Sequence, residues 1–297
     1  MKKCFLCAFI LLVFIAPAFS QGLNDPGLRT QIEQIAKPVK GIVGVSIKNI
    51  ETGDTLNYNG KARLVMHSVM KFPIALTVLH WVDTGKLQLN QLIHISKRDL
   101  VKDTWSPLRD KYPKGGDFPV SELLSYMISQ SDNNACDILL KQLGGPKTVQ
   151  DYLLQIGIRG IAVRTSETEM AASWELQYAN WCKPVEITAL FDQFYKGKIL
   201  AKPTTDSLYQ MLLNTNTGPK RLKGLLPVGA IVAHKTGSSP TSAEGLSPAT
   251  NDAGIITLPN GKHLIISVFV CNSTNDEATR EGTIAKIAKA AYDYYSK

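Results

Sequence analysis

The chain has 297 residues, 44% of them hydrophobic and 20% charged, which excludes intrinsic disorder and suffices for one large domain or two small ones. Its net charge is +8, but the basic residues are scattered and form no stripe interleaved with aromatic residues. This distribution argues against nucleic acid as a partner.

The first 20 residues are typical of a secretory signal peptide. A charged start, Met1-Lys2-Lys3, precedes an apolar run that ends at Ala18-Phe19-Ser20, a small-x-small cleavage pattern. The run is shorter than the roughly 20 apolar residues that a membrane span needs. We therefore predict a signal peptide over residues 1–20, export across the inner membrane to the periplasm, and no membrane anchor.

Strand patterns lie toward both ends of the mature chain. Hydrophobic residues alternate at Val43, Val45 and Ile47, after a helical pattern over residues 28–37 and before a short strand near residues 56–58. The C-terminal part predicts strands over residues 231–235, 254–258 and 263–271, with a hairpin turn at residues 259–262. An amphipathic helix is predicted over residues 277–295.

The middle of the chain predicts helices. Apolar residues recur there at helical spacing over residues 73–82, 120–128, 136–143, 149–156 and 185–195. The simplest architecture joins residues 21–62 and 213–297 in one α/β lobe, an antiparallel sheet covered by helices, beside an all-helical lobe of residues 63–212. A catalytic cleft between the lobes would collect residues from both.

The patterns of cysteine and histidine residues argue against metal and redox chemistry. Outside the predicted signal peptide the cysteines are Cys136, Cys182 and Cys271, all in apolar surroundings, so we expect buried thiols and at most one disulfide. The five histidines form no His-x-His or His-Glu-x-x-His pattern. Since phosphate-binding glycine loops are also absent from the sequence, we expect no metal and no cofactor.

Ser68 and Lys71 stand at the predicted start of a helix. Residues i and i+3 share one face of a helix, so the lysine amino group can reach the serine hydroxyl. Serine is a weak nucleophile until a neighbour takes its proton, and lysine can do so where its charge is disfavoured. Alone, the pattern is weak evidence, because it arises by chance about once in a chain of this length.

Two further motifs follow in order. Ser131-Asp132-Asn133 lies between two helical patterns, where it is either a helix N-cap or a proton relay through Ser131 beside an amide donor, Asn133. Lys235-Thr236-Gly237 follows a predicted strand, where it is either a polar strand end or a carboxylate-binding cation, hydroxyl and glycine. The ordered set of three indicates acyl transfer to a serine without a His-Asp pair.

With these motifs the chain resembles the class A serine β-lactamases. Residues 131–137, 221–224 and 234–237 are similar to the PER/VEB-type extended-spectrum branch, or subclass A2. The resemblance implies the α+β fold of serine β-lactamases and penicillin-binding proteins, an α/β sandwich with a five-stranded antiparallel sheet flanked by helices, plus an all-helical lobe. It also implies a monomer that hydrolyses β-lactam antibiotics, penicillins and cephalosporins among them, through an acyl-enzyme on Ser68.

The resemblance further implies a second base that hydrolyses the acyl-enzyme, a glutamate on an omega loop between the second and third motifs. Glu167 fits, because it stands three residues before Met170 and seventeen before Pro184. Glu169 is the alternative. Without the other motifs, this stretch would be read as a solvated acidic loop.

Two residues of this loop depart from the family pattern. Ala171 stands where many relatives have an Asn or His that helps to hold the hydrolytic water, and alanine has no side-chain donor or acceptor. Thr165 stands where an arginine often braces the loop. We therefore expect a differently braced loop and a water held mainly by Glu167 and Ser68.

The resemblance assigns the remaining roles. Either Lys71 or Glu167, acting through a water, would take the Ser68 proton. Backbone N–H groups of Ser68 and Ser238 would form the oxyanion hole, and an aromatic side chain at the cleft mouth would be Trp105, which could equally be a partly exposed packing residue. The carboxylate of the substrate would be held by Lys235, Thr236, Gly237 and Arg221.

Two rival functions share the three motifs. A D-Ala-D-Ala peptidase, or penicillin-binding protein, would have no need of the omega-loop glutamate. A penicillin-sensing domain would stay acylated, and such a domain normally adjoins a membrane segment. Hydrolysis of β-lactams separates both rivals from the favoured interpretation.

Overall fold

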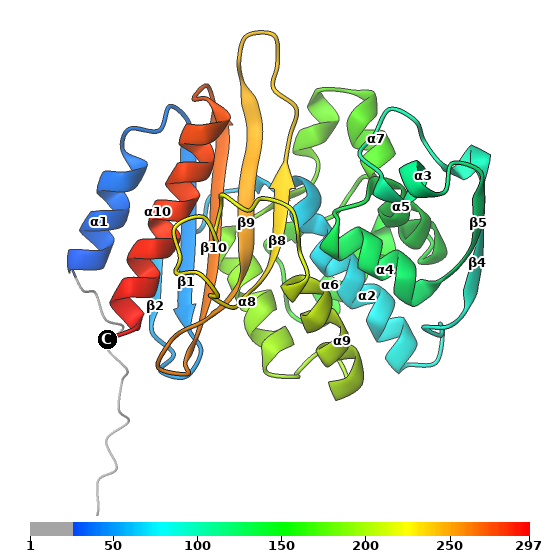
Figure 1. Ribbon diagram of the computed structural model, residues 1–297, viewed down its shortest axis with the longest axis horizontal. Helices are drawn as coiled ribbons and strands as arrows, with labels where there is room; N and C mark the ends of the chain where they lie inside the picture. The colour runs from blue at the N-terminus through cyan, green and yellow to red at the C-terminus, as the bar shows by residue number, and fades with distance from the viewer. Residues whose placement is uncertain (1–25) are drawn as a thin grey trace, which may run out of the picture.

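A five-stranded antiparallel sheet forms the centre of one half of the molecule (Figure 1), in the computed structural model that describes residues 26–297. The predicted signal peptide lies outside the described residues. The strand order is β2-β1-β10-β9-β8, with β1 Ile42–Asn49, β2 Thr55–Tyr58, β8 Val232–Ser238, β9 Ser247–Thr257 and β10 His263–Ser273. Early and late segments of the chain meet where β1 pairs with β10, from Ile42↔Cys271 to Asn49↔Leu264.

Helices cover both faces of this sheet. Helices α1 (Pro26–Ala36) and α10 (Glu277–Tyr295) lie together on one face, and α8 (Pro184–Tyr195) packs on the other. The predicted alternation in β1 is correct, because Val43, Val45 and Ile47 all contribute to the core beneath α1 and α10. The expected antiparallel five-stranded sheet flanked by helices is therefore confirmed.

The other half of the molecule is mostly helical. Its helices are α2 Lys71–Asp83, α3 Pro107–Lys111, α4 Val120–Ser129, α5 Asn133–Gln142, α6 Pro146–Gln155, α7 Glu167–Ala172 and α9 Lys202–Leu213, with the 3₁₀ turns η1 His67–Met70, η2 Lys97–Asp99 and η3 Glu175–Tyr178. It also contains short strands that the sequence did not predict, β3 Leu64–Val65, β4 Leu92–Ser96, β5 Gly115–Pro119, β6 Ile161–Ala162 and β7 Trp181–Cys182. Strands of two to five residues are too short to show a period. The division into lobes at residues 62/63 and 212/213 stays a prediction.

Helix α2 runs through the centre of the helical half, and it is the element that supports the motif around Ser68. Residues Lys71 to Leu79 are all buried, as in a helix that is hydrophobic on every side. Phe72 stacks on Phe191 of α8 with ring centroids 3.9 Å apart and meets the edge of Phe194 at 5.5 Å. This packing fixes the start of α2 against α8. Cys136, Cys182 and Cys271 are buried free thiols.

Strand β9 is longer than the sequence predicted, because it begins at Ser247 and not at residue 254. Its first half contains Thr250, which suits a strand, but also Asn251 and Asp252, whose side chains favour turns more than strands. All three are buried and hydrogen-bonded; for example, Asn251 donates to the Val65 carbonyl at 2.8 Å. Tertiary hydrogen bonds therefore override the local preference.

Candidate active site

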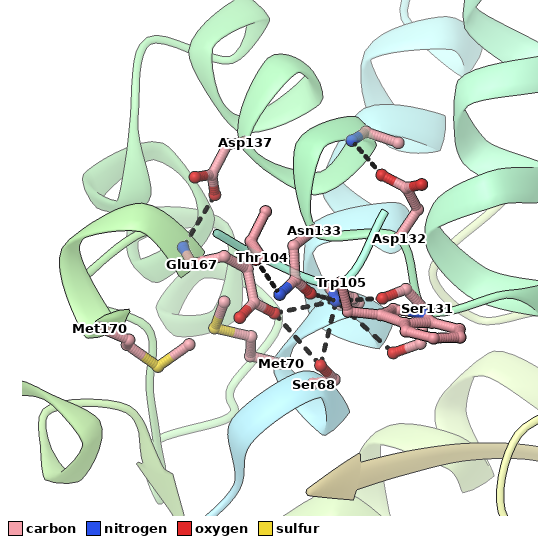
Figure 2. A network of polar contacts seen from close by, with 12 residues as sticks. Ser68, Met70, Thr104, Trp105, Ser131, Asp132, Asn133, Asp137, Glu167 and Met170 are labelled. Atoms are coloured by element: carbon pink, nitrogen blue, oxygen red, sulfur yellow. Dashed lines mark hydrogen bonds and ion pairs between the residues drawn. The ribbon is translucent and has the colours of Figure 1, made fainter. Parts of the chain in front are cut away.

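Ser68 lies in the 3₁₀ turn η1, which leads directly into α2. Its Oγ accepts a hydrogen bond from Lys71 Nζ at 3.0 Å and donates to Glu167 Oε1 at 3.2 Å. Ser68, Glu167, Ser131 and Asn133 point toward one another in Figure 2. The structure thus brings together residues of the first two motifs and the loop glutamate, nearly a hundred positions apart in the chain.

Lys71 is completely buried, yet its ammonium is fully paired. Besides Ser68 Oγ, Nζ contacts the Ser131 carbonyl at 2.7 Å, Asn133 Oδ1 at 2.5 Å and Glu167 Oε1 at 2.9 Å. A buried charge needs such partners, because burial without them costs several kcal/mol. The arrangement therefore stabilises a lysine cation beside the nucleophile.

Asp132 of the second motif is a helix N-cap, one of the two roles that the sequence left open, while the proton relay through Ser131 stays a prediction. Asp132 is the N-cap of α5, since its side chain accepts from Ala135 N, and it also accepts from Ser106 Oγ and from Leu108 N at 2.7 Å. Ser131 has φ +58°, in the left-handed region that non-glycine residues rarely adopt. The anchored Asp132 thereby holds its neighbours Ser131 and Asn133 at the wall of the cleft.

The third motif places a second buried lysine near the first. Lys235 Nζ donates to Ser131 Oγ at 2.9 Å, so Ser131 lies between Lys235 and Lys71, whose Nζ is 3.5 Å from the same oxygen. Burial, together with the like charge of Lys71, lowers the pKa of Lys235 well below its ordinary value. Gly237 is required on steric grounds, since a Cβ there would lie 2.3 Å from the Met66 carbonyl oxygen.

Glu167 begins helix α7, and its carboxylate is 7% exposed. Burial raises the pKa of this carboxyl, but the charge and hydrogen bond of Lys71, the nearby His67 and the Ser68 hydroxyl outweigh burial, so the pKa of Glu167 is lowered overall. The group is therefore a carboxylate at neutral pH. Glu169 is used differently, because its side chain accepts from Ser166 N at 2.7 Å in a capping box. The structure thus places Glu167, and not Glu169, beside Ser68.

The omega loop, defined here as residues 163–180, is held by two residues that the sequence analysis missed. Asp137 of α5 accepts from the backbone N–H group of Glu167 at 2.8 Å (Figure 2). It also accepts from Thr168 N at 2.9 Å and from Thr168 Oγ1 at 2.6 Å. Asn180 accepts from Arg164 N at 2.7 Å and from Thr165 N at 3.1 Å, and donates to the Thr165 carbonyl. These contacts brace the loop at Thr165, where the side chain offers no charge.

Arg221 reaches the cleft only indirectly. It is buried beneath β8, where its guanidinium pairs with Glu281 at 3.0 Å and donates to the carbonyls of Gly237 and Asn251. Its remaining contact is with Ser238 Oγ at 2.7 Å. Ser238 lines the cleft and Arg221 does not, so any effect of the guanidinium on a ligand passes through the strand.

A buried histidine–aspartate pair lies behind the third motif. His234 and Asp252 are both 0% exposed, and His234 Nδ1 is 2.9 Å from each carboxylate oxygen. Asp252 also accepts from Leu222 N at 3.2 Å. The carboxylate therefore ties the strand that carries Lys235 to the segment that carries Arg221.

The cleft itself is a cavity of about 540 Å³ lined by predicted site residues of both halves, although Lys71, Lys235, Gly237 and Arg221 are not in its lining. Ser68, Ser131, Asn133, Glu167, Thr236 and Ser238 line it, and so does Trp105, which is 60% exposed and donates from Nε1 to the Gln130 carbonyl. Trp105 is thus an exposed aromatic at the cleft. The sequence missed Thr217, a further lining residue whose Oγ1 is 2.6 Å from Thr236 Oγ1.

Residues 26–297 contain neither a metal-binding group of side chains nor a helix that could span a membrane. Within this range no cluster of three or more His, Cys, Asp or Glu side chains could hold a metal ion. No helix of the same residues is long and apolar enough to cross a bilayer.

A serine within hydrogen-bond distance of a lysine and a glutamate, on a sheet-and-helix fold of this kind, is the arrangement expected of a serine hydrolase. The chain belongs to the β-lactamase enzyme family, whose model matches residues 27–295, and it is a class A β-lactamase. It is 40% identical to β-lactamase VEB-1 of Pseudomonas aeruginosa over 96% of both chains. It is 39% identical to extended-spectrum β-lactamase PER-1 of the same species, over 99% of this chain and 96% of that relative.

Solved structures agree with this membership. A β-lactamase from Chitinophaga pinensis DSM 2588 superposes with a TM-score of 0.89 at 47% identity, covering 91% of this chain and 99% of the other. The TLA-1 extended-spectrum β-lactamase superposes with a TM-score of 0.90 at 44% identity, covering 92% and 99%. The predicted family, fold and β-lactam hydrolysis are thereby confirmed.

Proposed function

We propose that this β-lactamase opens its substrates through an acyl-enzyme on Ser68. The observation that carries the proposal is the position of Ser68 Oγ, 3.0 Å from Lys71 Nζ and 3.2 Å from Glu167 Oε1. Lys71 Nζ donates to several acceptors, as an ammonium does, and an ammonium has no lone pair with which to take a proton. The contacts therefore favour Glu167, directly or through a water, as the acceptor of the Ser68 proton, and leave Lys71 to stabilise the charge.

Ser131 is the proposed donor to the departing lactam nitrogen. Its Oγ accepts from Lys235 Nζ at 2.9 Å, and Lys71 Nζ lies 3.5 Å away. The pKa of Lys235 is lowered by burial first and by Lys71 second, which makes Lys235 a better acid than an ordinary lysine. A proton that leaves Ser131 can thus be replaced from Lys235.

The substrate is proposed to be anchored by its carboxylate and its side-chain amide. Lys235 supplies the positive charge, and the hydroxyls of Thr236 and Ser238 line the cleft on the same strand. Arg221 supports this strand from below by holding Ser238 Oγ and the Gly237 carbonyl. Backbone N–H groups of Ser68 and Ser238 form the proposed oxyanion hole.

Glu167 is the proposed base for deacylation. Replacement by alanine should trap a covalent acyl-enzyme, seen by intact mass as the enzyme plus one opened cephalosporin. Glu169→Ala is the matched control, because this neighbouring carboxylate serves only the capping box and should leave turnover intact. Rapid turnover by Glu167→Ala would refute the assignment.

Penicillins and cephalosporins, including bulky extended-spectrum cephalosporins, are the proposed substrates. Support comes from the 540 Å³ cleft and from the 39% identity to a relative described as an extended-spectrum β-lactamase. Steady-state kinetics with benzylpenicillin, nitrocefin and cefotaxime test this proposal, and a D-alanyl-D-alanine peptide tests the rival peptidase activity. Failure to hydrolyse cefotaxime would restrict the range to smaller side chains.

The mature enzyme is further proposed to be a periplasmic monomer. The leader-like residues 1–20 support export, and fractionation of a Gram-negative host, with β-lactamase activity assayed in each fraction, tests it. Light scattering on the purified chain tests the monomer. Activity retained in the cytoplasm, or a dimer mass, would contradict the respective proposal.

A further inference from the structure

His67 directly precedes the nucleophile and is the first residue of the 3₁₀ turn η1. The residue is 6% exposed and lines the same cavity as Ser68 and Glu167. Its backbone has φ +44°, a left-handed conformation that is uncommon for any residue except glycine and asparagine. An energetically unfavourable conformation beside a nucleophile is a reason to look for a function of the side chain.

Gln177 lines the cleft together with His67 and offers an acceptor for its ring. The Gln177 amide is oriented by its Nε2, which donates to the Trp174 carbonyl at 3.3 Å, so its Oε1 remains an acceptor. Gln177 Oε1 and His67 Nε2 are both buried without a hydrogen-bond partner, and both residues line the cleft. Pairing of this acceptor with the ring nitrogen would place the ring proton on Nε2.

The other ring nitrogen then carries a lone pair. Nδ1 is not among the buried unpaired atoms and makes no hydrogen bond within residues 26–297, so it keeps contact with the cavity that His67 lines. Burial lowers the pKa of His67 to about 4, so the ring is neutral at physiological pH. Nδ1 is therefore a hydrogen-bond acceptor at the floor of the cleft.

Glu167 needs a partner of this kind. Its Oε1 is engaged by Ser68 and Lys71, while its Oε2 makes no hydrogen bond within the described chain. Ala171, on the same helix α7, also lines the cavity but offers only a methyl group. Glu167 and His67 line the same cavity, and Ser68, the chain neighbour of His67, lies with its Oγ 3.2 Å from Glu167 Oε1.

We propose that His67 is a further catalytic residue, whose Nδ1 holds the hydrolytic water together with Glu167 in place of the group that Ala171 lacks. The inference rests on the proposed acyl-enzyme at Ser68. One water hydrogen points to the Glu167 carboxylate and the other to His67 Nδ1, which leaves an oxygen lone pair for the acyl carbonyl. Gln177 is a positioning residue, because it acts only through the orientation of the ring.

The deacylation step is balanced in bonds and protons. The water oxygen forms a bond to the ester carbon while Glu167 takes one proton. The bond from that carbon to Ser68 Oγ then breaks, and the proton on Glu167 returns to Ser68. The second water hydrogen stays on the product, which leaves as the carboxylic acid and ionises in solution. His67 accepts a hydrogen bond throughout and is never protonated.

The test separates deacylation from acylation by stopped-flow kinetics with nitrocefin and by intact mass in the steady state. His67→Ala and His67→Gly both remove the ring, but only glycine adopts φ +44° without strain. We expect both variants to deacylate about tenfold to a hundredfold more slowly, the range for loss of one hydrogen bond in a transition state, with acylation changed less than about threefold. Acyl-enzyme should then accumulate during turnover.

Three further variants sharpen the result. Gln177→Leu should slow deacylation less than loss of His67 does, because the ring remains. Asparagine tolerates the backbone at this position, so His67→Asn keeps an acceptor and should recover part of the rate. His80→Ala is the matched control, since this histidine stacks on Tyr152 with ring centroids 4.7 Å apart and is not part of the cavity lining.

Each failure has a separate meaning. Equal losses in acylation and deacylation would show that His67 only shapes the backbone of Ser68, and an unchanged deacylation rate would show that it does not touch the water. Either result overturns this inference while Glu167→Ala still traps the acyl-enzyme. If Glu167→Ala fails to trap it, the proposed function itself is wrong.

Discussion

The contact between Asp137 and the start of helix α7 is the sharpest place to test how this enzyme holds its deacylating base. Asp137 accepts from Glu167 N at 2.8 Å, Thr168 N at 2.9 Å and Thr168 Oγ1 at 2.6 Å. The first N–H groups of a helix have no partner within the helix, so a carboxylate from α5 satisfies two of them. Asp137→Ala removes all three bonds at once.

The size of the effect can be estimated from these contacts. A hydrogen bond to a charged group contributes about 1.5–3 kcal/mol when buried, but Thr168 is exposed and water can replace part of what is lost. About 2 kcal/mol of stability is therefore the expected cost for the two backbone groups. In a domain of this size, that lowers Tm by about 4–8 °C. Since Glu167 is one of the freed residues, deacylation should fall by about tenfold to a hundredfold.

Calorimetry and nitrocefin burst kinetics on Asp137→Ala and Asp137→Asn provide the assay. Asparagine can accept at only one of its two side-chain atoms, so it should lose about half of the stability that alanine loses. Acylation should be affected less than deacylation in both variants. A wild-type Tm together with a wild-type deacylation rate in Asp137→Ala would refute the idea that this carboxylate positions Glu167.

Two other outcomes follow from the electrostatics of the site. Because the pKa of Glu167 is lowered below 4.5, its carboxylate persists into acid solution. The acid limb of the pH profile of the deacylation rate should therefore lie below pH 4.5, and an acid limb above about pH 5 would contradict the assignment of the base. Asp252→Asn weakens the acceptor of His234 and of Leu222 N, so it should cost about 1.5–3 kcal/mol in thermal unfolding and raise KM for benzylpenicillin more than it lowers kcat. An unchanged KM would show that the pair is only structural.

The chemistry of the cleft could be predicted from sequence wherever it depends on short spacing. Ser68 and Lys71 are three residues apart at a helix start, so their contact follows from helix geometry alone. The strands could be predicted where one face is apolar, as in β1, and not where buried polar residues fill them, as in the first half of β9. No sequence pattern indicated the structural role of Asp252, because its partners His234 and Leu222 are 18 and 30 positions away in the chain.

The roles of Asp137, Asn180 and His67 could not be predicted for the same reason. Each is defined by a tertiary contact and not by a motif: Asp137 is 30 residues from Glu167 along the chain. A search for acidic side chains near the N-terminus of a helix would have found Asp137 only after the fold was known. Local patterns therefore predict the reacting groups but not the tertiary contacts that hold them.

The omega loop shows why the tertiary contacts that hold the reacting groups matter for the enzyme. Thr165 offers no charge to brace the loop and Ala171 offers no polar side-chain atom to hold its water. Helix α7 is only six residues long, too short to be stable alone. Its stability must then come from side chains that pack on it from α5, from the loop end at Asn180 and from the floor of the cleft. Exposed positions within the loop should therefore tolerate substitution. Changes to the contacts of Asp137, Asn180 and His67 should slow deacylation, although none of these residues belongs to a motif.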